Sequence, residues 1–363
     1  MAQLSVRDLT VHYGPVVAVD DISFEAQEGE FVSLLGPSGC GKTTTLRCIA
    51  GLESASCGEI RIGERVVAMK GREVPPEKRG VNMVFQSYAV WPHMSVFDNV
   101  AYGPRTHRRP AREVTERVTE ALALVGLTGF EKRFGTDLSG GQQQRVAVAR
   151  AIVMAPQLLL FDEPLSNLDA GLRERMRFEL VALQRKLGRT SIYVTHDQAE
   201  AMVMSDRIIL MNQGRIVQQG RPQDLYERPE TRFAAEFIGN ANLLEGTIIA
   251  DHPGVYHTIR LAEGLQLRGK PAWPNRPTAP DGRVLLCIRS ENLQLAADDS
   301  AEDNVFPARI ARVSYLGAAL NCELVCGTIR LRADMPGRSG LREGDELAVR
   351  VDPECAVIVP FAE

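Results

Sequence analysis

The sequence predicts an α/β domain followed by a small all-β domain. Two short apolar runs, Phe31–Leu35 and Leu158–Phe161, are typical of strands buried on both faces of a parallel sheet. After about Asn240, short apolar alternations separated by Gly, Pro and Asp replace this pattern. We therefore expect one domain over residues 1–239 and a second over residues 240–363.

The elements of the first domain follow one another in the order strand, loop and helix. Residues 4–28 alternate like exposed antiparallel strands, and a helix is expected between the first buried strand and Gly51. A further buried strand, Ser191–Thr195, leads into a helix, and residues 207–219 form a hairpin around Asn-Gln-Gly. Polar residues therefore gather at the carboxyl ends of parallel strands, where open α/β sheets bind ligands.

A mostly helical stretch interrupts this order of strands. Within it, residues 111–125 place Val114 and Val118 on one helical face, directly after Pro110. We expect an inserted helical subdomain at about residues 87–137.

The second domain is predicted to consist of short strands. Its apolar alternations include Val284–Ile288, Arg309–Val313, Cys322–Val325 and Glu346–Val351. This spacing predicts an all-β structure of roughly 120 residues. The pattern leaves a barrel and a sandwich equally open.

Charge and hydropathy exclude several classes of protein. Forty-two basic and forty-six acidic residues give a net charge of -4, which argues against a nucleic-acid coat or a polybasic membrane anchor. No run approaches the roughly eighteen apolar residues of a bilayer span, and the first residues lack a signal-peptide core. We expect a cytosolic protein that reaches a membrane only through a partner. The odd count of seven cysteines indicates reduced thiols, and Cys322 and Cys326 lack the nearby histidine that a metal site would favour.

Residues 36–43 read GPSGCGKT, which fits the P-loop pattern G-x-x-x-x-G-K-T between a buried strand and a helix. Glycines let the backbone wrap phosphates, and a helix N-terminus favours negative charge. Lys42 should reach the β- and γ-phosphates, and the Thr43 hydroxyl should ligate Mg²⁺. The alternative, a Gly-rich turn that merely contains Lys-Thr, does not explain the flanking strand and helix. The expected phosphate-binding residues are Gly36, Pro37, Ser38, Gly39, Cys40, Gly41, Lys42, Thr43 and Thr44.

Two acidic residues follow the buried strand Leu158–Phe161. Asp162 is placed to hold Mg²⁺ as a Walker-B carboxylate, and Glu163 to polarise the attacking water as a general base. The alternative is a pair of acids that only caps a strand. His196, at the end of a neighbouring strand, could contact the γ-phosphate, but a histidine there is usually structural. Its position alone leaves both roles open.

A second segment of the sequence is also suited to bind phosphate. Leu138–Arg145 reads LSGGQQQR and precedes a long helical run. Ser139 is a good N-cap, and the two glycines bare the N–H groups of the first helical turn. Two glycines in a first turn weaken a helix. Their presence is explained if a ligand must approach the backbone closely, and this favours phosphate binding over an ordinary capped helix.

The order of these motifs resembles that of ABC-type ATPase subunits over about residues 4–235. The matching segments are GPSGCGKT, Val84-Phe85-Gln86, LSGGQQQR, LLLFDEP, Ser166-Asn167-Leu168-Asp169 and Thr195-His196-Asp197. In that family two subunits pack head to tail. Each ATP then lies between the P-loop of one subunit and the signature motif of the other.

The resemblance implies a role for each matching residue. Gln86 would join Mg²⁺ and the attacking water to a membrane subunit, and Asp169 would communicate across the dimer. His196 would contact the γ-phosphate, and Tyr13 would stack on adenine, although a half-buried strand tyrosine would look the same. The residues expected to contact the partner's ATP are Ser139, Gly140, Gly141 and Gln142. The implied catalytic residues are Lys42, Gln86, Glu163 and His196, and the implied metal ligands are Thr43, Gln86 and Asp162.

Two phosphate-binding surfaces in one chain argue for a homodimer. A γ-phosphate that bridges two chains favours the closed dimer by its differential affinity, and hydrolysis removes the bridge. Because each surface carries one P-loop and one signature motif, the interface must be isologous. We expect a single chain to bind ATP but to hydrolyse it poorly.

Several features are similar to those of importer ATPases. One nucleotide-binding unit without a membrane span implies separate permease chains, and residues 86–94 resemble the region that meets permease coupling helices. The β domain resembles the OB-like TOBE module of maltose, polyamine and ferric-iron importers, but has Arg289-Ser290-Glu291 where that module often has Arg-Pro-Glu. Its entry, Gly239–Gly246, is closer to the iron and polyamine members than to the sugar members.

The resemblance therefore implies the energy-coupling subunit of an importer. It would bind ATP and Mg²⁺ at the cytoplasmic face of the inner membrane and receive solute indirectly from a solute-binding protein. The β domain lacks the basic stripe that nucleic acid requires, so a regulatory or dimer-stabilising role is expected. The alternatives are a sugar-importer ATPase, a soluble ABC ATPase acting on ribosomes or nucleic acid, and a P-loop kinase.

Overall fold

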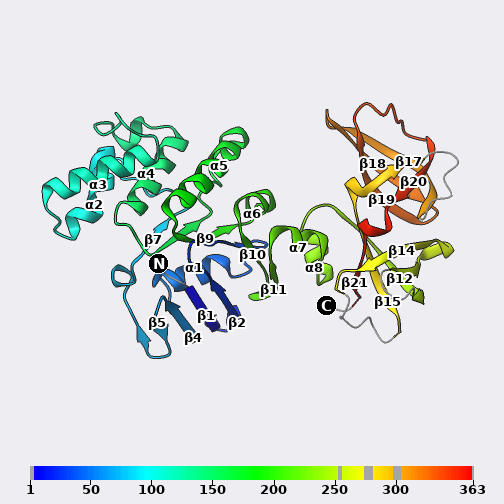
Figure 1. The fold of residues 1–363 in the computed structure, drawn as a ribbon, viewed down its shortest axis with the longest axis horizontal. Coiled ribbons are helices and arrows are strands. Elements are labelled where there is room, and N and C mark those ends of the chain that lie inside the picture. The colour runs from blue at the N-terminus through cyan, green and yellow to red at the C-terminus, as the bar shows by residue number, and fades with distance from the viewer. Residues whose placement is uncertain (1–3, 252–255, 274–280, 297–303, 362–363) are drawn as a thin grey trace. The chain divides into compact units, whose positions relative to one another are not determined.

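The computed structural model describes residues 4–251, 256–273, 281–296 and 304–361. The chain forms two compact units, Met1–Pro222 and Gln223–Glu363, both drawn in Figure 1. The expected α/β fold with inserted helices, followed by an all-β domain, is confirmed. The boundary at residues 239 and 240 and the limits 87–137 of the helical subdomain stay predictions.

A six-stranded sheet forms the centre of the first unit. Its order is β11-β10-β3-β9-β8-β7, and every pair is parallel except the β10–β11 hairpin. The strands are β3 (Phe31–Leu35), β7 (Val81–Val84), β8 (Leu158–Asp162), β9 (Thr190–Thr195), β10 (Arg207–Asn212) and β11 (Arg215–Gly220). In β8, Leu158 and Leu160 enter one hydrophobic core while Leu159 and Phe161 enter another. Burial on both faces explains why the run is apolar throughout.

A second sheet and a group of helices cover the two faces of the central sheet. Antiparallel strands in the order β2-β1-β4-β5-β6 share one core with α1, and α2 to α6 share the other. The first group is β1 (Leu4–Tyr13), β2 (Val16–Ala26), β4 (Cys57–Ile62), β5 (Arg65–Met69), β6 (Arg72–Glu73), α1 (Lys42–Ala50) and the 3₁₀ turn η1 (Pro76–Lys78). The second is α2 (Val96–Thr106), α3 (Ala111–Leu124), the 3₁₀ turn η2 (Gly135–Asp137), α4 (Gly140–Ile152), α5 (Ala170–Leu187) and α6 (Gln198–Met204).

Helices α2, α3 and α4 gather on the side away from β1, β2, β4 and β5 (Figure 1). As expected, α3 begins directly after Pro110 and buries Val114 and Val118 against its neighbours. No helix in the described part of the chain combines the length and apolar character that crossing a bilayer requires.

The second unit contains both a barrel and an open sheet. After α7 (Pro222–Glu227) and α8 (Arg232–Phe237), a closed barrel has the order β12-β13-β14-β21-β15, and a five-stranded sheet has the order β16-β20-β17-β18-β19. The barrel strands are β12 (Ala241–Asp251), β13 (His257–Arg260), β14 (Gln266–Pro271), β15 (Arg283–Arg289) and β21 (Ala356–Pro360). The sheet strands are β16 (Leu293–Leu295), β17 (Val305–Tyr315), β18 (Ala319–Cys326), β19 (Ile329–Pro336) and β20 (Glu346–Val351). Three 3₁₀ turns, η3 (Ala262–Gly264), η4 (Ser290–Asn292) and η5 (Pro353–Cys355), connect them. One core runs through both parts.

Candidate functional site

The P-loop lies between β3 and α1 and packs closely on neighbouring backbone. Gly41 has a φ of 102°, and a Cβ atom there would lie 2.6 Å from the carbonyl oxygen of Ala18 in β2. A Cβ atom at Gly36 would lie 2.2 Å from the carbonyl oxygen of Met211 in β10. Only glycine fits these two positions, so the glycines that suit phosphate are also required by the fold.

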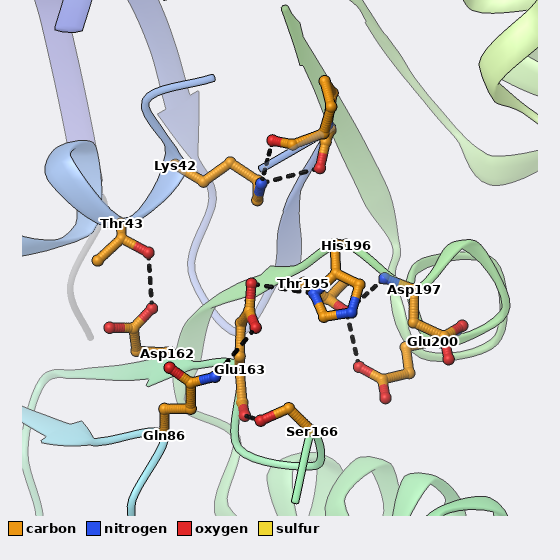
Figure 2. Close-up of polar contacts among 12 residues, drawn as sticks. Lys42, Thr43, Gln86, Asp162, Glu163, Ser166, Thr195, His196, Asp197 and Glu200 are labelled. Carbon is orange, nitrogen blue, oxygen red and sulfur yellow. Dashed lines mark hydrogen bonds and ion pairs between the residues drawn. The ribbon is translucent and has the colours of Figure 1, made fainter. Parts of the chain in front are cut away.

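The Lys42 ammonium points into the P-loop (Figure 2). The side chain is 4% exposed, and Nζ donates to the carbonyl oxygens of Gly36 and Pro37, each at 2.8 Å. Cys40 Sγ lies 3.7 Å from the same nitrogen. A cation held inside a loop at a helix N-terminus is well placed for phosphate oxygens.

Thr43 and Asp162 form a pair suited to Mg²⁺. Thr43 Oγ1 donates to Asp162 Oδ1 at 2.9 Å (Figure 2). Asp162 ends β8 and is 6% exposed; burial raises its pKa, while Thr43 and Arg47 act in the opposite direction. A desolvated carboxylate beside a hydroxyl offers the oxygen ligands that Mg²⁺ prefers, and a bound cation would offset its buried charge.

Glu163 lies between Gln86 and His196 (Figure 2). Gln86 Nε2 donates to Glu163 Oε2 at 3.4 Å, and His196 Nδ1 lies 3.1 Å from Glu163 Oε1. The backbone of Glu163 is left-handed, with a φ of 44°, and its carbonyl oxygen accepts from Ser166 Oγ at 2.9 Å. A non-glycine residue held in this conformation often marks a functional site. The structure therefore brings together three of the residues expected to act in catalysis, whose roles stay predictions.

Tyr13 lies at the end of β1 and contacts the P-loop residue Thr44. Its side chain is 46% exposed, and burial of the hydroxyl raises its pKa, with Glu53 raising it further. An exposed ring beside the P-loop is compatible with stacking on a nucleotide base, the role expected from the sequence.

Ser139 caps α4 in a reciprocal capping box. Its hydroxyl accepts from the Gln142 N–H at 3.4 Å, and Gln142 Oε1 accepts from the Ser139 N–H at 2.9 Å. Gly140 is exposed, whereas a Cβ atom at Gly141 would lie 3.1 Å from Leu172 in α5. Close packing against Leu172 therefore favours glycine at position 141, which the sequence did not reveal.

The signature segment, Leu138–Arg145, is separate from the P-loop of its own chain. Within the part of the chain that the structure describes, no hydrogen bond or ion pair joins Ser139, Gly140 or Gln142 to residues 36–44. Asp169 is also engaged locally, because its Oδ1 accepts from the Leu172 N–H at 2.9 Å and caps α5.

An arginine in α4 holds the loop that contains the predicted permease contact. The guanidinium of Arg150 donates to the carbonyl oxygens of Ala89 at 2.6 Å and Tyr88 at 2.9 Å, and its carbon lies 4.6 Å from the Trp91 ring centroid. Tyr88 and Ala89 are both left-handed, with φ of 60° and 48°. Trp91 in turn packs on Tyr102 with ring centroids 4.7 Å apart. We call the rings of Trp91 and Tyr102, together with the exposed rings of Phe85 and Phe134, the aromatic surface.

Two residues that lie next to the expected site residues, Arg150 and Glu200, were not predicted from the sequence. Arg150 contacts backbone carbonyls, which no motif encodes. Glu200 accepts a hydrogen bond from Thr195, close to His196 (Figure 2), and another from Tyr193. A signal for Glu200 was present, because Tyr193 and Thr195 are two residues apart on a strand and so present both hydroxyls to one face.

The fold and the P-loop geometry define a P-loop ATPase. Comparison with known families agrees: residues 19–166 match the ABC transporter family and residues 286–359 match the TOBE domain.

Known proteins similar to this chain show which kind of P-loop ATPase it is. The spermidine/putrescine import ATP-binding protein PotA of Rubrobacter xylanophilus is 48% identical over 98% of this chain and 90% of the relative. The trehalose/maltose import ATP-binding protein MalK of Thermococcus litoralis is 44% identical over 97% and 96%. The Fe(3+) ions import ATP-binding protein FbpC 1 of Rhizobium meliloti is 47% identical over 88% and 87%. The chain therefore belongs to the family of ATP-binding subunits of ABC importers, which are ATP-hydrolysing transport ATPases.

Solved structures are similar to the ATPase part. A cbiO1 structure from Clostridium perfringens, part of the transporter complex cbiONQ, has a TM-score of 0.56 and 30% identity over 61% of this chain and 89% of that chain. A dimeric ATP-binding cassette bound to ADP and Pi has a TM-score of 0.53 and 30% identity over 60% and 98%.

Proposed function

We propose that two copies of this chain close head to tail on two ATP molecules and reopen after hydrolysis. The observation that carries this proposal is the exposed, capped N-terminus of α4, which is not bonded to its own P-loop. The helix dipole and the N–H groups of Gly140 and Gly141, which are not part of the capping box, suit the γ-phosphate of a nucleotide held by a partner chain. The similar cassette solved as a dimer with ADP and Pi supports the arrangement.

Within each composite site, the residues have different proposed roles in binding ATP and Mg²⁺ and in hydrolysis. Lys42 contacts the β- and γ-phosphates, and Thr43, Gln86 and Asp162 hold Mg²⁺, which neutralises phosphate charge when bound. Glu163 takes a proton from the attacking water. The remaining residues and their proposed partners are His196 with the γ-phosphate, Tyr13 with adenine, Ser139, Gly140, Gly141 and Gln142 with the partner's ATP, and Asp169 with the partner chain.

We further propose that the aromatic surface binds a separate membrane permease. Its exposed rings suit a protein interface, and Gln86, which contacts Glu163, connects that interface to the hydrolytic site. The chain would then lie at the cytoplasmic face of the inner membrane and receive solute indirectly from a solute-binding protein. Nucleic acid is not among the proposed partners.

For the solute we propose ferric iron or a polyamine. The sequence Gly239–Gly246 at the entry to the second domain supports this choice, as do similar proteins named for iron and for spermidine/putrescine. A sugar is the second candidate, because a trehalose/maltose import protein is similar over nearly its whole length.

Purification of the full-length chain from membranes tests this function. We expect an integral membrane permease to co-purify, and the ATPase rate of that complex to rise with a solute-binding protein loaded with ferric iron or a polyamine. Stimulation by a sugar-loaded binding protein instead would overturn only the solute assignment. Recovery with ribosomes, and never with a permease, would overturn the importer function.

A further inference from the structure

A buried carboxylate lies just beyond His196. Glu200, in the first turn of α6, is 3% exposed. Its Oε2 accepts from Tyr193 Oη at 2.7 Å and from Thr195 Oγ1 at 2.8 Å. A buried carboxylate is costly unless it is well hydrogen-bonded, so its retention here calls for a specific explanation.

The hydrogen bonds of Glu200 close a ring around the His196 backbone. Thr195 Oγ1, which donates to Glu200, also accepts from the Asp197 N–H at 2.9 Å. Asp197 Oδ1 accepts from the Glu200 N–H at 3.1 Å. The residues on both sides of His196 are therefore bonded to Glu200, Thr195 to its carboxylate (Figure 2) and Asp197 to its backbone N–H.

A neighbouring helix anchors this ring from outside. Asp197 Oδ2 accepts from the Arg177 guanidinium at 3.0 Å, and Arg173 lies 3.7 Å from the same oxygen. Both arginines belong to α5, which Asp169 caps. The backbone of His196 is thus fixed relative to β9, α5 and α6.

The His196 side chain itself has little support. It is 54% exposed, and within the described residues the one ion-pair or hydrogen-bond partner of its ring is Glu163 Oε1, 3.1 Å from Nδ1. The direction of the imidazole therefore depends on the backbone that carries it. Small displacements of a reacting or orienting group can cost on the order of a hundredfold in rate.

We propose that Glu200 is a positioning residue for ATP hydrolysis and acts through His196. The ring of Thr195, Asp197 and Glu200 holds the imidazole where it meets both Glu163 and the γ-phosphate. This inference rests on the proposed role of His196. It requires a hydrogen-bond acceptor at position 200 rather than a charge, because one oxygen serves both hydroxyls.

ATPase kinetics of three full-length variants distinguish positioning from simple core stability. Glu200→Ala should lower kcat on the order of tenfold to a hundredfold and leave KM for ATP unchanged. Glu200→Gln keeps an acceptor oxygen and should restore most of the rate. Ser205→Ala is the matched control, because it removes a 2.6 Å hydrogen bond to Ser33 beyond the other end of α6. It should leave kcat unchanged. A Gln variant as slow as the Ala variant would overturn the proposal.

A double-mutant cycle with His196→Ala shows whether Glu200 acts through the histidine. In that background Glu200→Ala should cause no further loss of kcat, since the group it positions is gone. Independent, multiplicative losses would overturn the inference. If His196→Ala is inactive but Glu200→Ala is fully active, only this inference fails. If His196→Ala is itself fully active, the proposed role of His196 fails first.

Protein stability is measured alongside these rates. Thermal unfolding and ATP binding of each variant show whether it is folded under the assay conditions. If Glu200→Ala is unfolded, Thr195→Val replaces it, because valine keeps the shape of threonine and removes the hydroxyl that links Glu200 to Asp197. The same fall in kcat and the same lack of additivity with His196→Ala are expected, and a normal kcat in this variant would overturn the proposal.

Discussion

At the scale of single residues, Glu163→Gln separates ATP binding from hydrolysis. Glutamine keeps the size of the side chain and its contacts with Gln86 and His196, but it cannot take a proton from water. We expect ATP binding to be retained and phosphate release to fall on the order of a hundredfold or more. The variant should accumulate as an ATP-bound dimer, which size-exclusion chromatography detects. Normal turnover would show that Glu163 is not the general base.

The sequence predicted best those residues that belong to a motif of consecutive positions. Lys42 and Thr43 follow a strand, and Asp162 ends a parallel strand of the same sheet, so their meeting could be expected from strand ends alone. Glu200 was missed because the sequence does not show how α6 packs against β9. The spacing of Tyr193 and Thr195 was a signal that their hydroxyls share one face, but it did not identify Glu200 as their partner.

At the scale of secondary-structure elements, α4 joins two functions. Its N-terminus is the signature segment, and Arg150 near its C-terminus holds the carbonyls of Tyr88 and Ala89 beneath the aromatic surface. A rigid helix can carry a displacement from one end to the other. A movement of the loop that is proposed to bind a permease would therefore reach the segment that is proposed to contact the partner's ATP.

Arg150→Met tests this connection. Methionine keeps an unbranched apolar stem but removes the donors, so unfolding in urea should show a loss of about 2 kcal/mol for the charged hydrogen bonds. Permease-stimulated ATPase should fall further than basal ATPase. Arg112→Met is the control, because its contact is the exposed Glu116 and such a pair contributes at most about 0.5 kcal/mol. Equal falls in basal and stimulated rates would contradict a coupling role for Arg150.

The strands of the second unit show that a sequence pattern does not predict strand pairing. Alternation reveals that one face of a strand is buried, but not which strands pair. β14 and β21 pair in parallel through Lys270–Val357 and Pro271–Ile358, and this long-range pairing helps to close the barrel. The sequence therefore predicted all-β structure and left barrel or sandwich open, whereas the unit combines a barrel with a separate sheet.

At the scale of the whole molecule, the proposed dimer rests on the separation of two phosphate-binding surfaces within one chain. Each chain carries a P-loop and an exposed signature segment that do not bond to each other. A fold that kept both surfaces for its own nucleotide would bring them together within the chain. Two copies related by a two-fold axis, as proposed, would bring each P-loop against the signature segment of the other chain.

Mixed dimers test this arrangement directly. Lys42→Ala and Ser139→Arg chains should each be inactive alone, because every site in either homodimer is damaged. Mixed one to one, they should recover up to about a quarter of the wild-type phosphate release, since half of the dimers are mixed and each of those has one intact site. The control places both substitutions on one chain and mixes it one to one with wild type. Its mixed dimers should have no intact site, so phosphate release should come only from the wild-type homodimers, which are about a quarter of all dimers. Release of about half of the wild-type amount in this control, without rescue between the single variants, would mean that each chain uses its own signature segment.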